Sequence, residues 1–114
     1  MRALVIEPQV FTSLMVEDVL ADEGYTSIAV AATEEEAVAA ALAEPPDLVV
    51  AAVGLASGSG LDAVETIRSR CNTQVLFTTQ DVAAVQARAP DAPIVPKPFR
   101  PEDLRAAVAE LTRD

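Results

Sequence analysis

The chain has 114 residues, of which 51% are apolar but only 4% aromatic, and its formal net charge is −10. This length fits one domain over residues 1–114, with an aliphatic core of the kind that parallel strands and Ala-rich helices form. With no histidine and one cysteine, Cys71, the chain lacks the commonest transition-metal ligand and general base and cannot form an internal disulfide.

Short apolar runs alternate with segments of helical period along the whole chain. In order, the expected strands are 3–6, 27–31, 48–53, 74–78 and 94–96. The expected helices are 10–23, 33–44, 59–70, 81–89 and a last one that starts at Pro101. Gly24 suits a left-handed helix end, and Thr33 with Glu36 forms a capping box that opens the second helix.

No apolar run is long enough to cross a bilayer, and the N-terminus lacks a basic-then-apolar export signal. We therefore expect a cytoplasmic protein. A strongly acidic balance without a basic patch argues against nucleic acid and against a membrane surface as partners. A protein partner is the expectation that remains.

Five strands that alternate with five helices predict an α/β fold with a parallel sheet and right-handed crossovers. Ligands of such sheets bind beyond the carboxyl ends of the strands. The residues expected there are Glu7, Ala52, Thr79 and Lys97. Lys97 is the only lysine among eight basic residues, which suggests that a compact ammonium charge is needed at this position. The simpler interpretation is a solvated lysine at a strand end.

Several short motifs occur in a specific order. They are Pro46-Asp47-Leu48-Val49-Val50, Gly60-Leu61, Glu65-Thr66-Ile67-Arg68, Thr79 and Lys97-Pro98-Phe99. With these motifs the chain resembles a response-regulator receiver domain, CheY-like, over essentially its whole length. The resemblance implies a flavodoxin-like sheet of order 2-1-3-4-5 with helices on both faces, and a cis peptide bond between Lys97 and Pro98.

In that family a phosphoryl group moves from a kinase histidine to an aspartate at the end of the third strand. Two acids after the first strand help to hold Mg²⁺, and a threonine and a lysine contact the phosphoryl oxygens. Thr79 and Lys97 match this pattern, and Glu7 takes the place of the first acid. The second acid is replaced by Pro8 and the phosphoryl acceptor by Ala52.

A methyl group neither attacks phosphorus nor coordinates a metal, and a single glutamate is a poor site for octahedral Mg²⁺. We therefore expect no metal and no cofactor. The switch aromatic of the family, near the start of the fifth strand, is here Ile94. Lys97 is expected to pair with Glu7 across the strand ends.

The fourth helix is predicted to be short, because Pro90 and Pro93 leave room for little more than two turns from Asp81 to Ala89. In the family this helix, the fifth strand and the fifth helix form a common output and dimer face. The chain must present a different surface there.

The first helix has more apolar residues than one buried stripe requires. Val10 and Leu14 point away from the buried side and Phe11 lies on its flank. One hypothesis is that these three residues form an exposed contact patch for a helical partner or a second copy of the chain. The alternative is that they are ordinary, isolated exposed apolar side chains.

Three other features have a structural explanation. Cys71 is better explained as a small core residue than as a redox group. Asp62 and Asp47 are conceivable substitute phosphoryl acceptors, but Asp62 suits the first turn of a helix and Asp47 lies at the wrong end of the third strand. The glycine-rich segment 57–60 lacks the lysine and the spacing of a phosphate-binding loop, and is expected to be a mobile loop.

The sequence thus predicts a pseudo-receiver: a receiver fold that is not an enzyme, accepts no phosphoryl group and acts as a protein-interaction module in bacterial two-component signalling. Its expected partner is a histidine kinase, a phosphotransfer or other signalling protein, or a second copy. One alternative is a receiver that is still phosphorylated on a substitute carboxylate. Another is a small-anion sensor that uses Thr79, Lys97 and Glu7.

Overall fold

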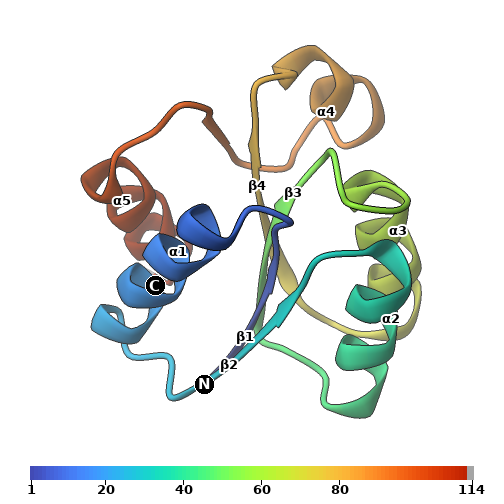
Figure 1. The fold of residues 1–114 in the computed structure, drawn as a ribbon, viewed down its shortest axis with the longest axis horizontal. Helices are drawn as coiled ribbons and strands as arrows, with labels where there is room; N and C mark the ends of the chain where they lie inside the picture. Colours follow the sequence, from blue (N-terminus) through green and yellow to red (C-terminus); the bar gives the residue numbers. More distant parts are fainter. Residues whose placement is uncertain (113–114) are drawn as a thin grey trace.

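The computed structural model describes residues 1–112, in which strands and helices alternate (Figure 1). The strands are β1 (Arg2–Ile6), β2 (Ser27–Ala31), β3 (Leu48–Ala52), β4 (Gln74–Thr79) and β5 (Ile94–Pro96). The helices are α1 (Val10–Asp22), α2 (Glu34–Ala43), α3 (Gly60–Arg70), α4 (Val82–Arg88) and α5 (Pro101–Thr112). Within this part of the chain, no helix is both long and apolar enough to cross a membrane.

All strands are parallel, and their order is β2-β1-β3-β4-β5. Helices α1 and α5 cover one face of the sheet, and α2 and α3 cover the other (Figure 1). The predicted fold class, strand order and two-faced helix cover are therefore confirmed. The order places β1, β3 and β4 in the middle of the sheet, so that their carboxyl ends lie side by side at one edge.

The core consists of one aliphatic cluster on each face of the sheet. In β3, whose residues are all buried, Leu48 and Val50 belong to the cluster under α1 and α5, while Val49 and Ala51 belong to the cluster under α2 and α3. This alternation follows from the two-residue period of a strand. A continuous apolar run therefore marks a strand that is covered on both faces.

The helix ends follow the predicted capping residues with one difference. Gly24 has a φ of 99°, and the Thr33 hydroxyl accepts a hydrogen bond from the Glu36 N–H at 3.1 Å. A reciprocal capping box would direct the Glu36 carboxylate to the Thr33 N–H. It accepts instead from the N–H of Ala32, at 2.9 Å, one residue earlier.

The loop between β3 and α3, which we expected to be mobile, is fastened to the start of α2. The Glu34 N–H donates to the Ser57 carbonyl at 3.0 Å, and the Ser59 N–H donates to Glu34 Oε1, also at 3.0 Å. Between them, Gly58 has a φ of 82° and passes close to the Glu34 side chain. The loop is therefore held from both ends by a residue about 25 positions away in the sequence.

Candidate functional site

The carboxyl ends of the strands bring the predicted site residues to one edge of the sheet. Glu7 follows β1, Ala52 ends β3, Thr79 ends β4 and Lys97 follows β5. An open pocket of about 440 Å³, here called the strand-end pocket, lies at this edge. Its lining includes Gln9, Ala52, Gly54, Thr79, Asp81 and Lys97.

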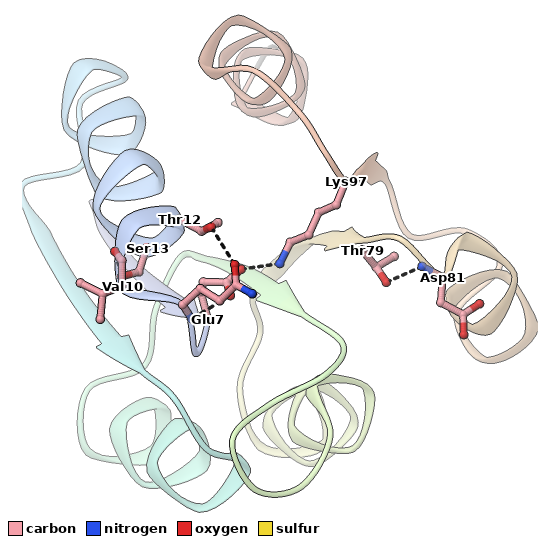
Figure 2. A network of polar contacts seen from close by, with 8 residues as sticks. Glu7, Val10, Thr12, Ser13, Thr79, Asp81 and Lys97 are labelled. Atoms are coloured by element: carbon pink, nitrogen blue, oxygen red, sulfur yellow. Dashed lines mark hydrogen bonds and ion pairs between the residues drawn. The ribbon is translucent and has the colours of Figure 1, made fainter.

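An ion pair between Glu7 and Lys97 spans this edge (Figure 2). Lys97 Nζ lies 2.7 Å from Glu7 Oε1, and Glu7 Oε2 accepts a hydrogen bond from the Gln9 N–H at 3.1 Å. The Glu7 side chain is 3% exposed and that of Lys97 22%. Both carboxylate oxygens are thus occupied, and the ammonium charge of Lys97 is balanced by a buried carboxylate, in the pairing that the sequence led us to expect.

Thr79 faces the beginning of α4 rather than the ion pair. Its hydroxyl accepts a hydrogen bond from the Asp81 N–H at 2.9 Å (Figure 2). Asp81 in turn caps α4, because its Oδ1 accepts from the Ala84 N–H at 3.1 Å. The Thr79 hydroxyl therefore has a local structural role in the turn that leads from β4 to α4.

Ala52 places a methyl group where the family resemblance expects the acceptor carboxylate. It is 2% exposed and lines the strand-end pocket. The neighbouring strand β1 pairs Ile6 with Ala51, so Glu7 follows directly opposite Ala52. Pro8 follows Glu7 without adding a carboxylate. The edge therefore offers a bound glutamate and a methyl group in place of an acidic cluster.

The last part of the predicted site lies around β5. The Lys97–Pro98 peptide bond is cis. Ile94 pairs across the sheet with Phe77 and packs against the core cluster under α2 and α3. Its partly buried aliphatic side chain thus packs on the rim of the core and has no polar group to offer to Thr79.

The other two acidic candidates, Asp62 and Asp47, do not line the strand-end pocket. Asp62, an exposed residue in the first turn of α3, pairs with Arg88 at 2.8 Å. Asp47 precedes β3, where its carboxylate accepts from the Arg2 N–H at 2.8 Å, at the opposite edge of the sheet. Cys71 is half-buried and packs against the core cluster under α2 and α3.

Gln9 and Asp81 are among the residues of the strand-end pocket that were not predicted as site residues. Asp81 was interpreted only as a helix start, although it follows Thr79 at the end of a strand by two positions. Gln9 follows Glu7 by two positions in the same way. In both cases the available signal was closeness to a strand end. Across residues 1–112, no group of three or more Asp, Glu, Cys or His side chains is arranged to hold a metal ion.

The first turns of α1 carry the apolar residues that we predicted to be exposed. The exposed fractions are 67% for Val10, 89% for Phe11 and 51% for Leu14. The opposite side of α1 buries Val16, Val19 and Leu20. Ser13 is also buried, because it precedes Leu20 by seven positions and so lies on the same side of the helix, and its hydroxyl donates to the Val10 carbonyl at 2.9 Å.

The fold and the strand-end site define a receiver-type α/β signalling module, and the comparisons with known proteins identify the family. A family model of the response regulator receiver domain matches residues 3–109. The chain therefore belongs to the response regulator receiver family and is a receiver domain of two-component signalling. Proteins of this family work with signalling protein partners.

Three relatives illustrate the match. The transcriptional regulatory protein YvrH of Bacillus subtilis (strain 168) is 35% identical over 104 residues, which is 87% of this chain but only 44% of YvrH. The receiver domain of PhyR from Erythrobacter litoralis has a TM-score of 0.86 at 32% identity, covering 96% of this chain and 87% of that one. The chemotaxis protein CheY4 of Vibrio cholerae has a TM-score of 0.82 at 25% identity, covering 96% of each chain. The chain thus spans less than half of the curated relative that it matches.

Proposed function

We propose that this chain is a pseudo-receiver, which takes part in two-component signalling as a protein-interaction module and accepts no phosphoryl group. The observation that carries this proposal is Ala52. A methyl group occupies the end of β3, and a buried carboxylate already engages Lys97.

The chemistry of phosphoryl transfer supports the proposal. The acceptor must be a nucleophilic oxygen, and a methyl group offers none. Mg²⁺ is commonly held in such sites through one or two carboxylates, and the only acid directly after β1 is Glu7, both of whose oxygens are engaged. A receiver of this kind is not an enzyme and needs no metal cofactor. Its output depends on its surface, in the cytoplasm that the sequence suggests.

The printed names of the relatives suggest the kind of partner. YvrH is a transcriptional regulatory protein, and a PhyR from Bartonella quintana, 27% identical with a TM-score of 0.83, is described as an anti-anti-sigma factor. The match covers 96% of this chain but only 47% of that PhyR chain. We therefore propose a signalling protein as the partner, such as a histidine kinase, a phosphotransfer protein or a second copy, and no nucleic acid.

The partner is proposed to dock on Val10, Phe11 and Leu14. These side chains are among the most exposed large apolar groups of the described residues and lie within two turns of one helix. Replacing Leu14 by glutamate places a charge in the patch without touching the core, so association is expected to be lost and the fold kept. Ala21→Glu adds the same charge to an exposed position outside the patch and serves as the control.

Two measurements test the patch. Sedimentation velocity measures association with a second copy of the chain. Binding to an immobilised histidine kinase core measures association with a helical partner. If Leu14→Glu and Ala21→Glu associate equally strongly in either assay, a role for the patch is contradicted.

Incubation with acetyl phosphate and Mg²⁺, or with beryllium fluoride and Mg²⁺, tests the loss of phosphorylation. Intact mass and thermal melting are the readouts, and a receiver with an aspartate at the Ala52 position is the positive control. We expect no added phosphoryl mass and no stabilisation. A Mg²⁺-dependent adduct would overturn the proposal in favour of a substitute carboxylate, with Glu7, Asp62 and Asp81 as the first positions to map.

The strand-end pocket favours one other candidate function, a small-anion sensor. The pocket is open, about 440 Å³ in volume, and is lined by Thr79 and by Lys97. The ion pair with Glu7 argues against it, because an anion would have to displace a carboxylate 2.7 Å from the ammonium. Stabilisation by inorganic phosphate or sulfate without Mg²⁺, lost in Lys97→Met, would support the sensor over the pseudo-receiver.

A further inference from the structure

A second pocket, here called the α3–α4 pocket, lies away from the strand ends. Its volume is about 320 Å³. The apolar part is formed by Leu61, Val64 and Phe77, and the polar rim by Glu65, Arg68 and Arg88. Cavities that bind small molecules have volumes of roughly 300–1,000 Å³, mostly apolar walls and a few polar groups that fix orientation. The α3–α4 pocket is at the small end of this range.

The pocket lies beside the C-terminal end of α4. Helix α4 ends at Arg88, and Pro90 cannot continue it. The residues of α3 that line the pocket are spaced by three and four positions, so one face of α3 is turned toward the pocket beside Arg88 and Ala89. Val85 of α4 is fully buried, which keeps the remaining helix against the core. The pocket therefore opens where α4 ends, while α4 itself stays packed against the core.

Arg88 and Arg68 line the same pocket but differ in their electrostatic state. Arg88 pairs with Asp62 and with Glu65, each at 2.8 Å, and the side-chain hydrogen bonds to Glu65 and then to Asp62 raise the pKa of Arg88. No ion pair or hydrogen bond engages the side chain of Arg68 within residues 1–112. Arg68 is therefore the rim cation that has its charge available for a ligand.

We propose that the α3–α4 pocket binds a small amphipathic carboxylate, with its hydrocarbon part against Leu61, Val64 and Phe77 and its carboxylate paired with Arg68. A guanidinium matches a carboxylate with two parallel hydrogen bonds. The neighbouring Glu65 disfavours ligands of higher negative charge, such as a phosphate dianion. The site is independent of Ala52 and of the strand-end pocket, and thus goes beyond the proposed pseudo-receiver role.

Sodium octanoate is a suitable probe, and 1-octanol is its uncharged counterpart. Backbone amide NMR shifts are followed during titration of each compound into the whole chain. We expect octanoate to shift the amides near Leu61, Val64 and Ala89 in a saturable way, with a Kd in the low millimolar range, as roughly ten heavy atoms allow. Octanol is expected to bind roughly ten-fold more weakly, because it lacks the charge-assisted pair.

Two matched variants locate the anion contact. Arg68→Gln is expected to weaken octanoate binding roughly ten-fold, whereas Arg70→Gln, at an exposed arginine of the same helix outside the pocket, leaves it unchanged. A third variant, Ala89→Phe, fills the pocket and is expected to abolish the shifts, with the rest of the spectrum reporting an intact fold. The proposal is overturned by non-saturable shifts, by shifts that centre on Thr79 and Lys97, by equal binding of octanol, or by equal effects of the two arginine variants.

Discussion

The ion pair between Glu7 and Lys97 leads to the sharpest prediction about stability. Lys97→Met keeps an unbranched apolar stem, one atom shorter, but removes the ammonium. Glu7 then remains 4% exposed with a carboxylate whose Oε1 has lost its partner, while Oε2 still accepts from the Gln9 N–H. A buried carboxylate without a counter-charge is strongly unfavourable.

The size of the effect follows from the burial of the two side chains. Breaking a fully buried pair from one side costs about 3–5 kcal/mol. Because the Lys97 side chain is 22% exposed and water reaches the edge, we expect a somewhat smaller loss, roughly 2–4 kcal/mol in the free energy of unfolding. For a chain of this size that is a fall in Tm of about 10 °C.

Urea denaturation at neutral pH measures the loss, and Glu7→Gln with the double variant Glu7→Gln/Lys97→Met completes a double-mutant cycle. We expect the double variant to be less destabilised than the sum of the single variants, by about 1–2 kcal/mol. Arg105→Met is the control. It breaks an ion pair with Asp22 at 3.0 Å whose side chains are 43% and 64% exposed, and should cost less than about 1 kcal/mol. If Lys97→Met costs no more than Arg105→Met, the reasoning from burial is wrong.

Two further predictions concern Tyr25 and the glycines after β3. Burial first, and then the charges of Asp47 and Glu23, raise the pKa of Tyr25, the only tyrosine of the chain. The neutral phenol of Tyr25 therefore contributes its full stabilisation below about pH 10, where tyrosine titrates in the unfolded chain. This stabilisation is lost as the pH rises through the pKa of Tyr25 in the folded state. Near-ultraviolet titration should place the midpoint of the Tyr25 phenol above that of free tyrosine, and a normal midpoint would contradict the prediction. Tyr25→Phe should remove the loss of stability at alkaline pH. Gly60→Ala should destabilise the chain by more than about 2 kcal/mol in urea, because the new Cβ would lie 1.7 Å from the Ala52 carbonyl oxygen. Gly54→Ala meets nothing within 4 Å and should be neutral, so equal effects of the two substitutions would refute the argument.

Local patterns were sufficient to predict the elements, whereas the order of the strands in the sheet came from the resemblance to the receiver family. The run 94–96 was assigned as a strand and forms β5, and Pro101 begins α5 as its fixed φ favours. The short α4 followed from Pro90, since a proline cannot continue a helix. These features depend on residues that are close together in the sequence. Each strand end was predicted from local sequence in the same way, and this placed Glu7, Ala52, Thr79 and Lys97 at the carboxyl ends of their strands.

Features that depend on distant side chains could not be predicted in the same way. The bond from Ser59 to Glu34 joins residues 25 positions apart, and neither residue signals the other. The segment around Gly58 was therefore expected to be mobile. The α3–α4 pocket has the same origin, because it depends on how residues of α3, β4 and the end of α4 come together. Arg68 could be recognised as a possible ligand contact only after Arg88 was found paired with Asp62 and Glu65.

The positions of Glu7 and Ala52 explain why one acid is kept at an edge where the acceptor position is a methyl group. Glu7 follows directly opposite Ala52 on neighbouring parallel strands, and Lys97 needs a counter-charge there. An aspartate restored by Ala52→Asp would put a second carboxylate beside Glu7, so like-charge repulsion should lower the free energy of unfolding by about 1–3 kcal/mol. A divalent cation between the two carboxylates would relieve that repulsion.

Thermal melting with and without Mg²⁺ therefore tests whether the carboxylate that is missing at Ala52 is what keeps Mg²⁺ from binding at this edge. We expect Mg²⁺ to raise the Tm of Ala52→Asp but not of the native chain, because only the variant offers two carboxylates. An equal response of both proteins would mean that Glu7 alone attracts the cation, and that its pairing with Lys97 at 2.7 Å is too weak to prevent metal binding. An absence of response in Ala52→Asp, despite the expected destabilisation, would mean that two carboxylates do not suffice for the metal while Pro8 stands in place of a second acid and Lys97 engages Glu7.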